Sequence, residues 1–362
     1  MAKLVRGLGF ALVVGCSSPK STQSDAREPD VAADAAADVA IDVMVDAAID
    51  VPVDVPIDGP SSSPRCAAGA TIALDVSPLK ITTMARSGST LYVSTYDPAN
   101  FGQGTLYTFD LTTHTQTAAP FVTTGILQVG ESPGDVFAAE PSAGRIWQLH
   151  PGAAPQVLVS DRVDPWVPVA DSTHVYWAEL TPTSSGRQVV RSAIAGGPVE
   201  PLMACQAYQL AIVGQHIYCA GQNGVRRHRT DGTGATEFIS YAGISVVFAL
   251  AAAGTDAVFA PFGAGSTLFR VDSTTTAATA ITPISGPRNS DVATSSDYFY
   301  LLDLTSAVRR IHRTTAQEEL VYSSGGGRPV PQQWVVLWNE HLYFDAQDSQ
   351  LGGTSYLMHC VD

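Results

Sequence analysis

The feature that most constrains the fold of this chain is a repeat of about 42 residues. An aromatic residue, which follows an aliphatic one in six of seven cases, recurs at intervals of 45, 39, 42, 41, 41 and 43 residues. The seven positions are Tyr92, Phe137, Tyr176, Tyr218, Phe259, Tyr300 and Tyr343. Between them lie short runs of alternating apolar and polar residues, separated by glycine-bearing turns, as expected of antiparallel strands. Such a period with several short strands per unit is typical of a β-propeller blade.

The innermost strand of each repeat is predicted just before its aromatic position. The residue seven positions before each signature aromatic is small or β-branched in all seven repeats. The residue eight positions before it is apolar in all seven. Two adjacent apolar positions indicate a strand covered on both faces, as it would be where neighbouring blades converge on a central channel. Gln209 and Asp291 interrupt these strands. We predict that they face the channel, where polar groups usually bind neighbouring backbone.

The two ends of the repeat region predict how the ring closes. The seventh repeat stops before a fourth strand, and the alternating segment Ala70 to Val76 could supply that strand from the other end of the region. We therefore predict an all-β fold over residues 66–362: a seven-bladed β-propeller of four-stranded antiparallel blades, closed by the N-terminal strand. A six-bladed ring with a divergent first repeat is the alternative.

Four cysteines in the repeat region are predicted to form two disulfides. Cys66 and Cys360 would meet where the ring closes, and Cys205 and Cys219 flank the inner strand of the fourth repeat. An even number of cysteines in an exported chain favours disulfides. A metal site at these thiols is disfavoured, because no cysteine has a CxxC partner and no histidine stands at ligand spacing from them. Free buried thiols are the other alternative.

The first sixteen residues have the pattern of an export signal. Lys3 and Arg6 precede an apolar run, Leu8 to Val14, that is too short to span a bilayer. The tetrad Val-Val-Gly-Cys at 13–16 resembles a bacterial lipobox, in which the cysteine is lipidated and becomes the new N-terminus. The resemblance implies a lipoprotein signal peptide at 1–15 and an acyl anchor on Cys16. An ordinary signal peptide with an incidental cysteine is the alternative.

Residues 16–65 are predicted to be a disordered tether. Aspartate recurs every fourth residue from Asp30 to Asp58, with prolines in the second half. Like charges four residues apart repel one another in a helix, and the prolines exclude one, so an extended chain is favoured. An array of calcium sites is the sharper alternative, but these carboxylates are isolated and lack a folded loop to converge them.

Charge and motifs exclude several functions and identify no enzyme. A net charge of -14 argues against nucleic acid or anionic lipid as a partner, so we expect membrane contact through the lipid anchor only. No HExxH, P-loop or GxGxxG motif is present, and we predict neither a cofactor nor a metal. The basic run 226–229 is interpreted as a solvated strand edge rather than an anion site. We expect the eight histidines to lie apart from one another, on the surface or on strand faces. They are His114, His150, His174, His216, His228, His312, His341 and His359.

A binding surface is predicted on one face of the ring. In a propeller the turns between second and third strands share a face with the connections between blades, and loops carry function more often than the scaffold does. The longest such segments here are 95–104, 180–186, 325–333 and 345–354. They offer an aromatic and polar mixture suited to a protein or glycan partner, namely Tyr96, Phe101, Arg328 and Gln333.

The repeats resemble YWTD-like and NHL-like propeller repeats. The likeness is clearest in His-Val-Tyr-Trp-Ala-Glu at 174–179 and His-Leu-Tyr-Phe-Asp at 341–345, although no unit carries a complete Tyr-Trp-Thr-Asp. The resemblance implies an extracytoplasmic propeller that serves as an interaction platform. Together with the lipobox and tether, the chain looks like an envelope lipoprotein of a Gram-negative bacterium, anchored at the outer membrane or cell surface.

Three functional hypotheses follow from this sequence. The leading one is a monomeric, lipid-anchored platform that binds a protein or glycan at the cell envelope. The alternative is a propeller enzyme, such as a hydrolase, lyase or quinoprotein-type dehydrogenase, with its site at the mouth of the central channel. That alternative requires convergent acids, bases or a metal at the inner-strand ends. A purely structural envelope component is the third.

Overall fold

A computed structural model of the chain provides the fold. It describes residues 66, 71–117, 121–123, 125, 127–131, 134–181, 186–243, 246–263, 266–284, 289–303, 307–324, 330–339, 341–348 and 354–361. The chain divides into two units, 1–56 and 57–362, and all of the described residues belong to the second. The predicted signal peptide, Cys16 and the tether lie outside the described residues. Within that described part, no helix is long and apolar enough to cross a membrane.

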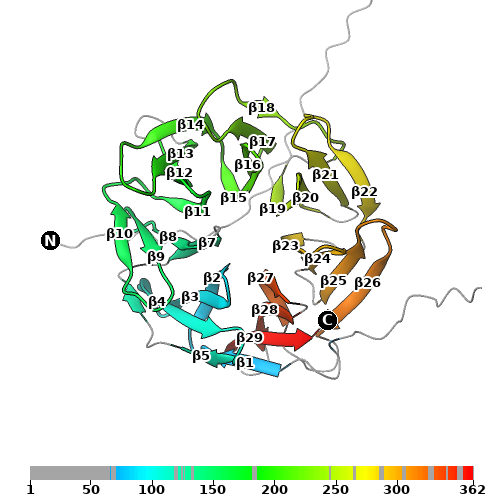
Figure 1. Ribbon diagram of the computed structural model, residues 1–362. Coiled ribbons are helices and arrows are strands. Elements are labelled where there is room, and N and C mark those ends of the chain that lie inside the picture. Colours follow the sequence, from blue (N-terminus) through cyan, green and yellow to red (C-terminus); the bar gives the residue numbers. More distant parts are fainter. Residues whose placement is uncertain are drawn as a thin grey trace, which may run out of the picture. The chain divides into compact units, whose positions relative to one another are not determined.

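The described residues form seven antiparallel sheets, which follow one another around a central axis (Figure 1). Blade 1 contains β2 (Lys80–Ser87), β3 (Thr90–Asp97), β4 (Asn100–Asp110), β5 (Thr115–Gln116) and the short β6 (Phe121–Thr123). Blade 2 contains β7 (Gln128–Glu131), β8 (Val136–Glu140), β9 (Arg145–Leu149) and β10 (Gln156–Val159). Blade 3 contains β11 (Trp166–Ala170), β12 (His174–Leu180), β13 (Arg187–Ala193) and β14 (Glu200–Ala204). Blade 4 contains β15 (Ala207–Val213), β16 (His216–Gly221), β17 (Gly224–Arg229) and β18 (Glu237–Phe238).

The remaining three blades complete the ring. Blade 5 contains β19 (Val247–Ala253), β20 (Asp256–Pro261), β21 (Thr267–Asp272) and β22 (Thr279–Pro283). Blade 6 contains β23 (Asn289–Thr294), β24 (Tyr298–Asp303), β25 (Ala307–His312) and β26 (Glu318–Ser323). Blade 7 contains β27 (Val330–Trp338), β28 (His341–Asp348), β29 (Thr354–Val361) and β1 (Thr71–Asp75). The predicted seven-bladed propeller is confirmed, and the six-bladed alternative is excluded.

The ring closes in the predicted way. β1 pairs with β29, so that one blade contains both ends of the repeat region, and the inner strand β27 packs against β2 of blade 1. The disulfide between Cys66 and Cys360 joins residues 294 positions apart. The backbone N–H of Cys66 donates to Val321 O of blade 6 at 2.8 Å. The second predicted disulfide, Cys205–Cys219, also forms.

The core lies between neighbouring blades and is built from the repeat itself. All seven aromatic signature residues are buried, with at most 3% of their surface exposed. Each packs into an apolar cluster shared with an adjacent blade, and a side chain of this kind stabilises the fold by roughly 1.5–3 kcal/mol. At the centre the inner strands approach so closely that Gly130 has no room for a side chain: a Cβ there would lie 1.5 Å from Pro168 O.

Six inner strands share one irregularity near their start. In β2, β11, β15, β19, β23 and β27 the pairing register with the second strand of the blade shifts at this point. A β-bulge changes the direction in which a side chain points. The bulges therefore decide which side chains line the upper part of the channel.

The predicted loop 95–104 is almost entirely strand in the structure, and strands also include residues 330–333 and 345–348 of two others. β3 ends at Asp97 and β4 begins at Asn100, so only residues 98 and 99 turn, where 95–104 was predicted to be a loop. The prediction was wrong because the ladder continues past the body of the sheet, pairing Tyr96 with Gly104. Gln333 likewise lies inside β27. The segments 182–185, 325–329 and 349–353 lie outside the described residues.

Candidate binding face and central channel

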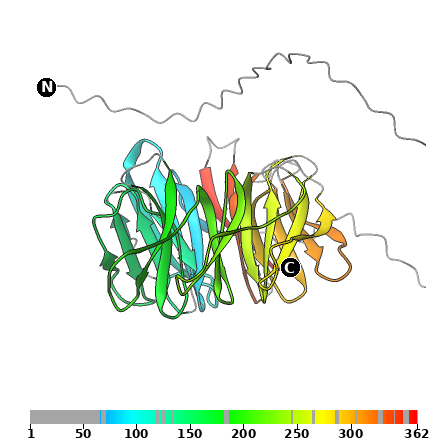
Figure 2. The ribbon, with the colours of Figure 1, turned by 90° about the horizontal axis from the view of Figure 1, so that it is seen from above.

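The inner strands all start on one side of the ring, which we call the upper face. Turns between second and third strands lie on this side, together with the connections from one blade to the next. The opposite side, the lower face, carries the turns between first and second strands and between third and fourth strands. Figure 2 shows the ring from its edge, with β28 and β29 (red) reaching the upper face at the top.

A cavity of about 820 Å³ follows the central axis. All seven inner strands line it. Near the upper face each blade contributes one residue, at the position nine before its signature aromatic. These residues are Thr83, Gln128, Val167, Gln209, Leu250, Asp291 and Trp334. Gln209 and Asp291 thus face the channel, as predicted.

The polar members of this group hydrogen-bond to the backbone of the next blade. Thr83 Oγ1 accepts from Val129 N at 2.8 Å, and Gln128 Oε1 accepts from Val167 N at 3.0 Å. Because such a bond satisfies a buried backbone donor, each side chain fastens its own blade to its neighbour.

Gln209 and Asp291 extend this series and are also joined to one another. Gln209 Oε1 accepts from Leu250 N at 2.8 Å, and its Nε2 donates to Asp291 Oδ1 at 3.0 Å. Asp291 Oδ2 accepts from Val335 N at 3.0 Å. Both side chains therefore fasten blades, the role that polar groups usually have at such positions.

Few ionisable side chains line the described part of the channel. Among the described residues that line it, the ionisable ones are Arg86, Asp171 and Asp291. The Asp171 carboxylate accepts hydrogen bonds from Thr173 N, His174 N and Tyr176 Oη, at 2.7–2.8 Å. Like Asp291, it is engaged in holding the fold.

On the upper face, the connection between β10 and β11 and the first residues of β11 have an unusual backbone. Asp161, Asp164 and Val167 adopt positive φ angles of 59°, 51° and 44°. This conformation is unfavourable for residues other than glycine, most of all for a β-branched one, and such strain concentrates at functional sites. Arg162 holds the connection in place by pairing with the buried carboxylate of Glu179, with Nε and Oε2 2.9 Å apart.

Trp166, the first residue of β11, is open to solvent. The residue is 36% exposed, and its Nε1 donates to Asp164 Oδ1 at 2.8 Å. The Arg187 guanidinium lies 5.1 Å from the ring centroid and also pairs with the Asp164 carboxylate. A cation over an indole face contributes about 0.5–1 kcal/mol at an exposed site. Trp166 is therefore held in one orientation while a substantial part of its surface remains open.

A second aromatic group lies on the upper face of blades 4 and 5. Tyr208, near the start of β15, stacks on Phe248 at 4.4 Å between ring centroids, and Phe262 meets Phe248 edge-on at 4.9 Å. Tyr208 is 36% exposed. We refer to Trp166, Tyr208, Phe248 and Phe262 as the aromatic arc.

Of the binding-face residues predicted from loop length, the two whose side chains the structure describes lie elsewhere on the upper face. Tyr96 is half-buried near the end of β3 in blade 1, and Gln333 is exposed on β27 in blade 7 with its backbone N–H donating to Asp345 Oδ1. The Phe101 side chain and Arg328 lie outside the described residues. The arc was not foreseen, although the segment Asp161 to Trp166, with its two aspartates and a proline before a tryptophan, carries a detectable signal.

Comparison with known proteins returns matches of structure only. No family model and no curated protein matches the sequence. A structure of virginiamycin B lyase from Staphylococcus aureus with quinupristin superposes with a TM-score of 0.61 at 10% identity, over 80% of this chain and 98% of the lyase. YCF48 bound to D1 peptide gives 0.59 at 10% identity, over 81% of this chain and 96% of YCF48. The designed protein Ika8 gives 0.52 at 14% identity, over 75% of this chain and 81% of Ika8.

The chain is a β-propeller. At these sequence identities the structural similarity establishes the fold alone. The function has to be inferred from the residues of this chain.

Proposed function

We propose that this propeller is a monomeric, lipid-anchored platform that captures a protein or glycan partner at the bacterial cell envelope. The observation that carries the proposal is Trp166, held in a single orientation by Asp164 and Arg187 on a strained connection of the upper face. The aromatic arc extends the contact surface across three neighbouring blades.

The chemistry of the arc favours a protein over a glycan. Tryptophan, tyrosine and arginine are the residues most enriched at the centres of protein interfaces. Side chains that are already ordered lose little entropy on binding, so the ion pair and the stacked rings lower the free-energy cost of association. The acidic net charge of the chain argues against nucleic acid.

The N-terminal sequence supports the envelope location. A charged start, a short apolar run and Cys16 follow the order of a lipoprotein signal, and the acidic segment after them would hold the propeller away from the membrane. The two disulfides are consistent with an oxidising compartment outside the cytoplasm.

An enzymatic function is less well supported. Structures with this fold include both a lyase and a propeller solved with a bound peptide, so the fold accommodates either role. In this chain the carboxylates that line the described part of the channel bind backbone or a tyrosine hydroxyl.

A capture experiment tests the platform. A Cys16→Ser form of the whole chain, exported without an anchor, would be immobilised and exposed to a detergent extract of the envelope. We expect a partner that is retained by this form and lost with Trp166→Ala and Tyr208→Ala combined. The matched control is Phe238→Ala, because Phe238 is an exposed aromatic (61%) on the outermost strand of blade 4, away from the arc. Equal capture by all three forms would reject the arc as the binding site, and release of the partner by free sugars would identify a glycan.

The anchor has a separate test. Cells fed an alkyne-bearing palmitate should label the unmodified chain and leave Cys16→Ser unlabelled. Label on both forms, or on neither, would contradict lipidation at Cys16.

A further inference from the structure

The lower edges of three blades carry the same cross-strand arrangement of tyrosine, arginine and glutamate, which we call the arginine staple. In blade 3 the signature residue Tyr176 is paired across strands with Arg191, and Arg191 with Glu200. Arg191 Nη2 lies 2.7 Å from Glu200 Oε2, and Nη1 donates to Thr230 O in a turn of blade 4. One guanidinium thus joins its own blade to the next.

Blades 4 and 6 repeat this register. Tyr218 pairs with Arg227 and Arg227 with Glu237, and the guanidinium reaches Ser273 O of blade 5 at 2.8 Å. The same cross-strand sequence in blade 6 is Tyr300, Arg310 and Glu319. The basic run 226–229 is therefore only partly a solvated edge, because Arg227 and His228 are buried.

The seam between blades 7 and 1 departs from the staple at every polar position. Tyr343 is paired with His359 in place of an arginine, and His359 with Thr71 in place of a glutamate. Where another blade would offer a turn carbonyl, blade 1 offers the His114 side chain. His341, two residues before Tyr343, occupies the same face of the sheet. The even spread of histidines along the sequence does not predict this grouping.

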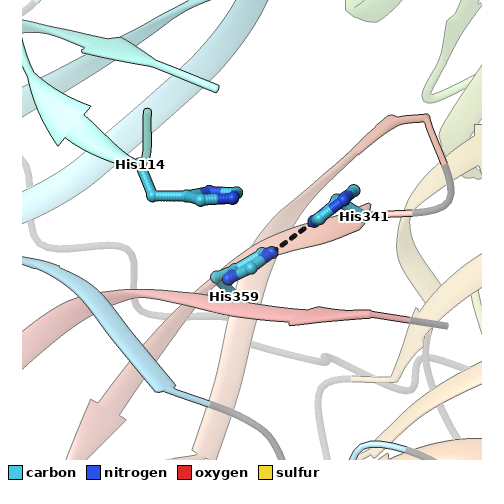
Figure 3. A group of neighbouring side chains, drawn as sticks. All are labelled: His114, His341 and His359. Atoms are coloured by element: carbon cyan, nitrogen blue, oxygen red, sulfur yellow. Dashed lines mark hydrogen bonds between the residues drawn. The ribbon is translucent and has the colours of Figure 1, made fainter. Parts of the chain in front are cut away.

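The three histidines form a compact cluster (Figure 3). One ligand nitrogen from each lies within 4.8 Å of the other two. His341 Nδ1 is hydrogen-bonded to His359 Nε2 at 2.7 Å, and the His114 ring stacks on that of His359 with centroids 4.5 Å apart. His114 is exposed, whereas the other two side chains are half-buried.

Neighbouring groups orient His114. The Tyr343 hydroxyl hydrogen-bonds to His114 Nδ1 at 2.9 Å, which leaves Nε2 available to a ligand. His114 has a φ angle of 56°, and the turn before it is fixed by Asp110 Oδ1, which accepts from Thr112 N and Thr113 N. A hydrogen-bonded partner that sets the orientation of an imidazole is the usual accompaniment of a metal-ligating histidine.

We propose that His114, His341 and His359 bind one divalent transition-metal ion, with zinc as the representative. The site contains imidazoles alone, which suit zinc, copper and nickel rather than calcium or magnesium. Ligands 2.0–2.1 Å from a tetrahedral zinc lie about 3.3 Å from one another, so the imidazoles, whose nitrogens now lie within 4.8 Å, would rotate out of their stacked arrangement to direct one nitrogen each at the ion. Three protein ligands leave the fourth position to water, on the exposed side beside His114.

A metal ion here would link blades 7 and 1, whose interface has no arginine staple. His341 and His359 belong to blade 7 and His114 to blade 1, so the ion would join the two ends of the ring. Because the ligand set assembles only in the folded ring, binding raises the free energy of unfolding.

The test is zinc binding by the whole Cys16→Ser chain, prepared without a histidine tag and freed of metal by a chelator. Calorimetry at pH 7.5 is expected to give one site per chain with a micromolar or lower Kd, together with a rise in Tm. His114→Asn is expected to weaken binding at least 100-fold, because asparagine accepts the left-handed backbone while the ligand is lost. The control His174→Asn removes a histidine that bonds to Thr173, away from the seam, and should leave the Kd unchanged.

Cobalt provides a second readout. A visible absorption spectrum of tetrahedral cobalt without the intense thiolate charge-transfer band would identify an all-nitrogen site, and that spectrum should vanish in His114→Asn. If zinc fails to saturate the chain below about 100 μM, or if the two variants bind alike, the proposal is wrong. The Tm of the parent and of both variants would also be measured in chelator. Equal values would show that the variants are folded and that any loss of binding comes from loss of the ligand.

Discussion

The interface between blades 3 and 4 and the seam between blades 7 and 1 occupy equivalent places in the ring but differ in chemistry. At the first, Arg191 connects Tyr176, Glu200 and the carbonyl of Thr230. At the second, histidines occupy the corresponding positions; β1 of blade 7 pairs with β29, and the chain before β1 is tied to β29 by the Cys66–Cys360 bond. The staple is not general, because the signature residues of blades 1, 2 and 5 pair with Thr108, Gln148 and Phe269. The polar positions at this edge of the ring therefore vary from blade to blade.

The largest expected effect is that of the closing disulfide. In the chain-entropy model, replacing Cys66 and Cys360 by alanine lowers the free energy of unfolding by about 5 kcal/mol, because the bridged residues are 294 positions apart. Replacing Cys205 and Cys219, 14 positions apart, costs about 3 kcal/mol. Denaturant titrations of the two double variants would measure both values. Equal losses would show that the seam does not depend specially on its covalent bond.

The next effect concerns pH and a buried carboxylate in blade 7. Burial raises the pKa of Asp345 to about 7, against the lowering influence of hydrogen bonds from Trp334 N and Gln333 N. An unfolded aspartate titrates near pH 4. The contribution of Asp345 to the free energy of unfolding is therefore complete below about pH 4 and is lost as the pH rises through about 7. The loss amounts to at most about 4 kcal/mol.

Asp345→Asn keeps the acceptor oxygen and removes the titration. Between pH 5 and pH 8 the unfolding midpoint of the parent should fall, and that of the variant should remain more nearly constant. The comparison residue is Glu179 of blade 3, whose buried carboxylate has Arg162 as its partner. Identical pH profiles for parent and Asp345→Asn would refute the assignment.

A smaller loss in the free energy of unfolding is expected at the interface between blades 3 and 4. Arg191→Gln removes a guanidinium that bonds to a carboxylate and a carbonyl, and hydrogen bonds to charged groups contribute about 1.5–3 kcal/mol. His359→Gln, measured in chelator, should cost less than about 1 kcal/mol. The two unfolding curves would be compared in the same buffer, and a larger loss for His359→Gln would reverse the comparison.

The smallest effect comes from rebuilding the staple at the seam. Thr71→Glu with His359→Arg restores the pair found at Glu200 and Arg191 in the same cross-strand register. We expect the free energy of unfolding in chelator to change by less than about 1 kcal/mol, because exposed ion pairs contribute little. We also expect zinc no longer to raise the Tm. A rise in Tm that survives the exchange would place the metal elsewhere.

The fold could be predicted because its signal is local and repeated. Strand alternation and the period of the signature aromatics report burial at each blade, so blade number, ring closure and both disulfides followed from spacing. Gln209 and Asp291 could be placed in the channel because a polar residue in an apolar strand is conspicuous.

The candidate sites were less predictable because they depend on contacts between distant residues. His114 and Tyr343 are 229 positions apart, and nothing near either one indicates the other. Trp166 resembles any strand aromatic until its exposure and its contact with Arg187 are known. The extension of β3 and β4 through Asp97 and Asn100 likewise depends on pairing that composition does not reveal.

The Cys66–Cys360 bond also determines how the propeller responds to mechanical load. A pull applied between the chain before Cys66 and the end of β29 passes through the bond itself, bypassing the hydrogen bonds of β1, so the enclosed chain bears none of that load while the bond is intact. Reduction would release the 294-residue separation at once, on the order of 1,000 Å of extended polypeptide. Under such a pull the blades would stay closed in an oxidising environment and would unravel only where thiols are reduced.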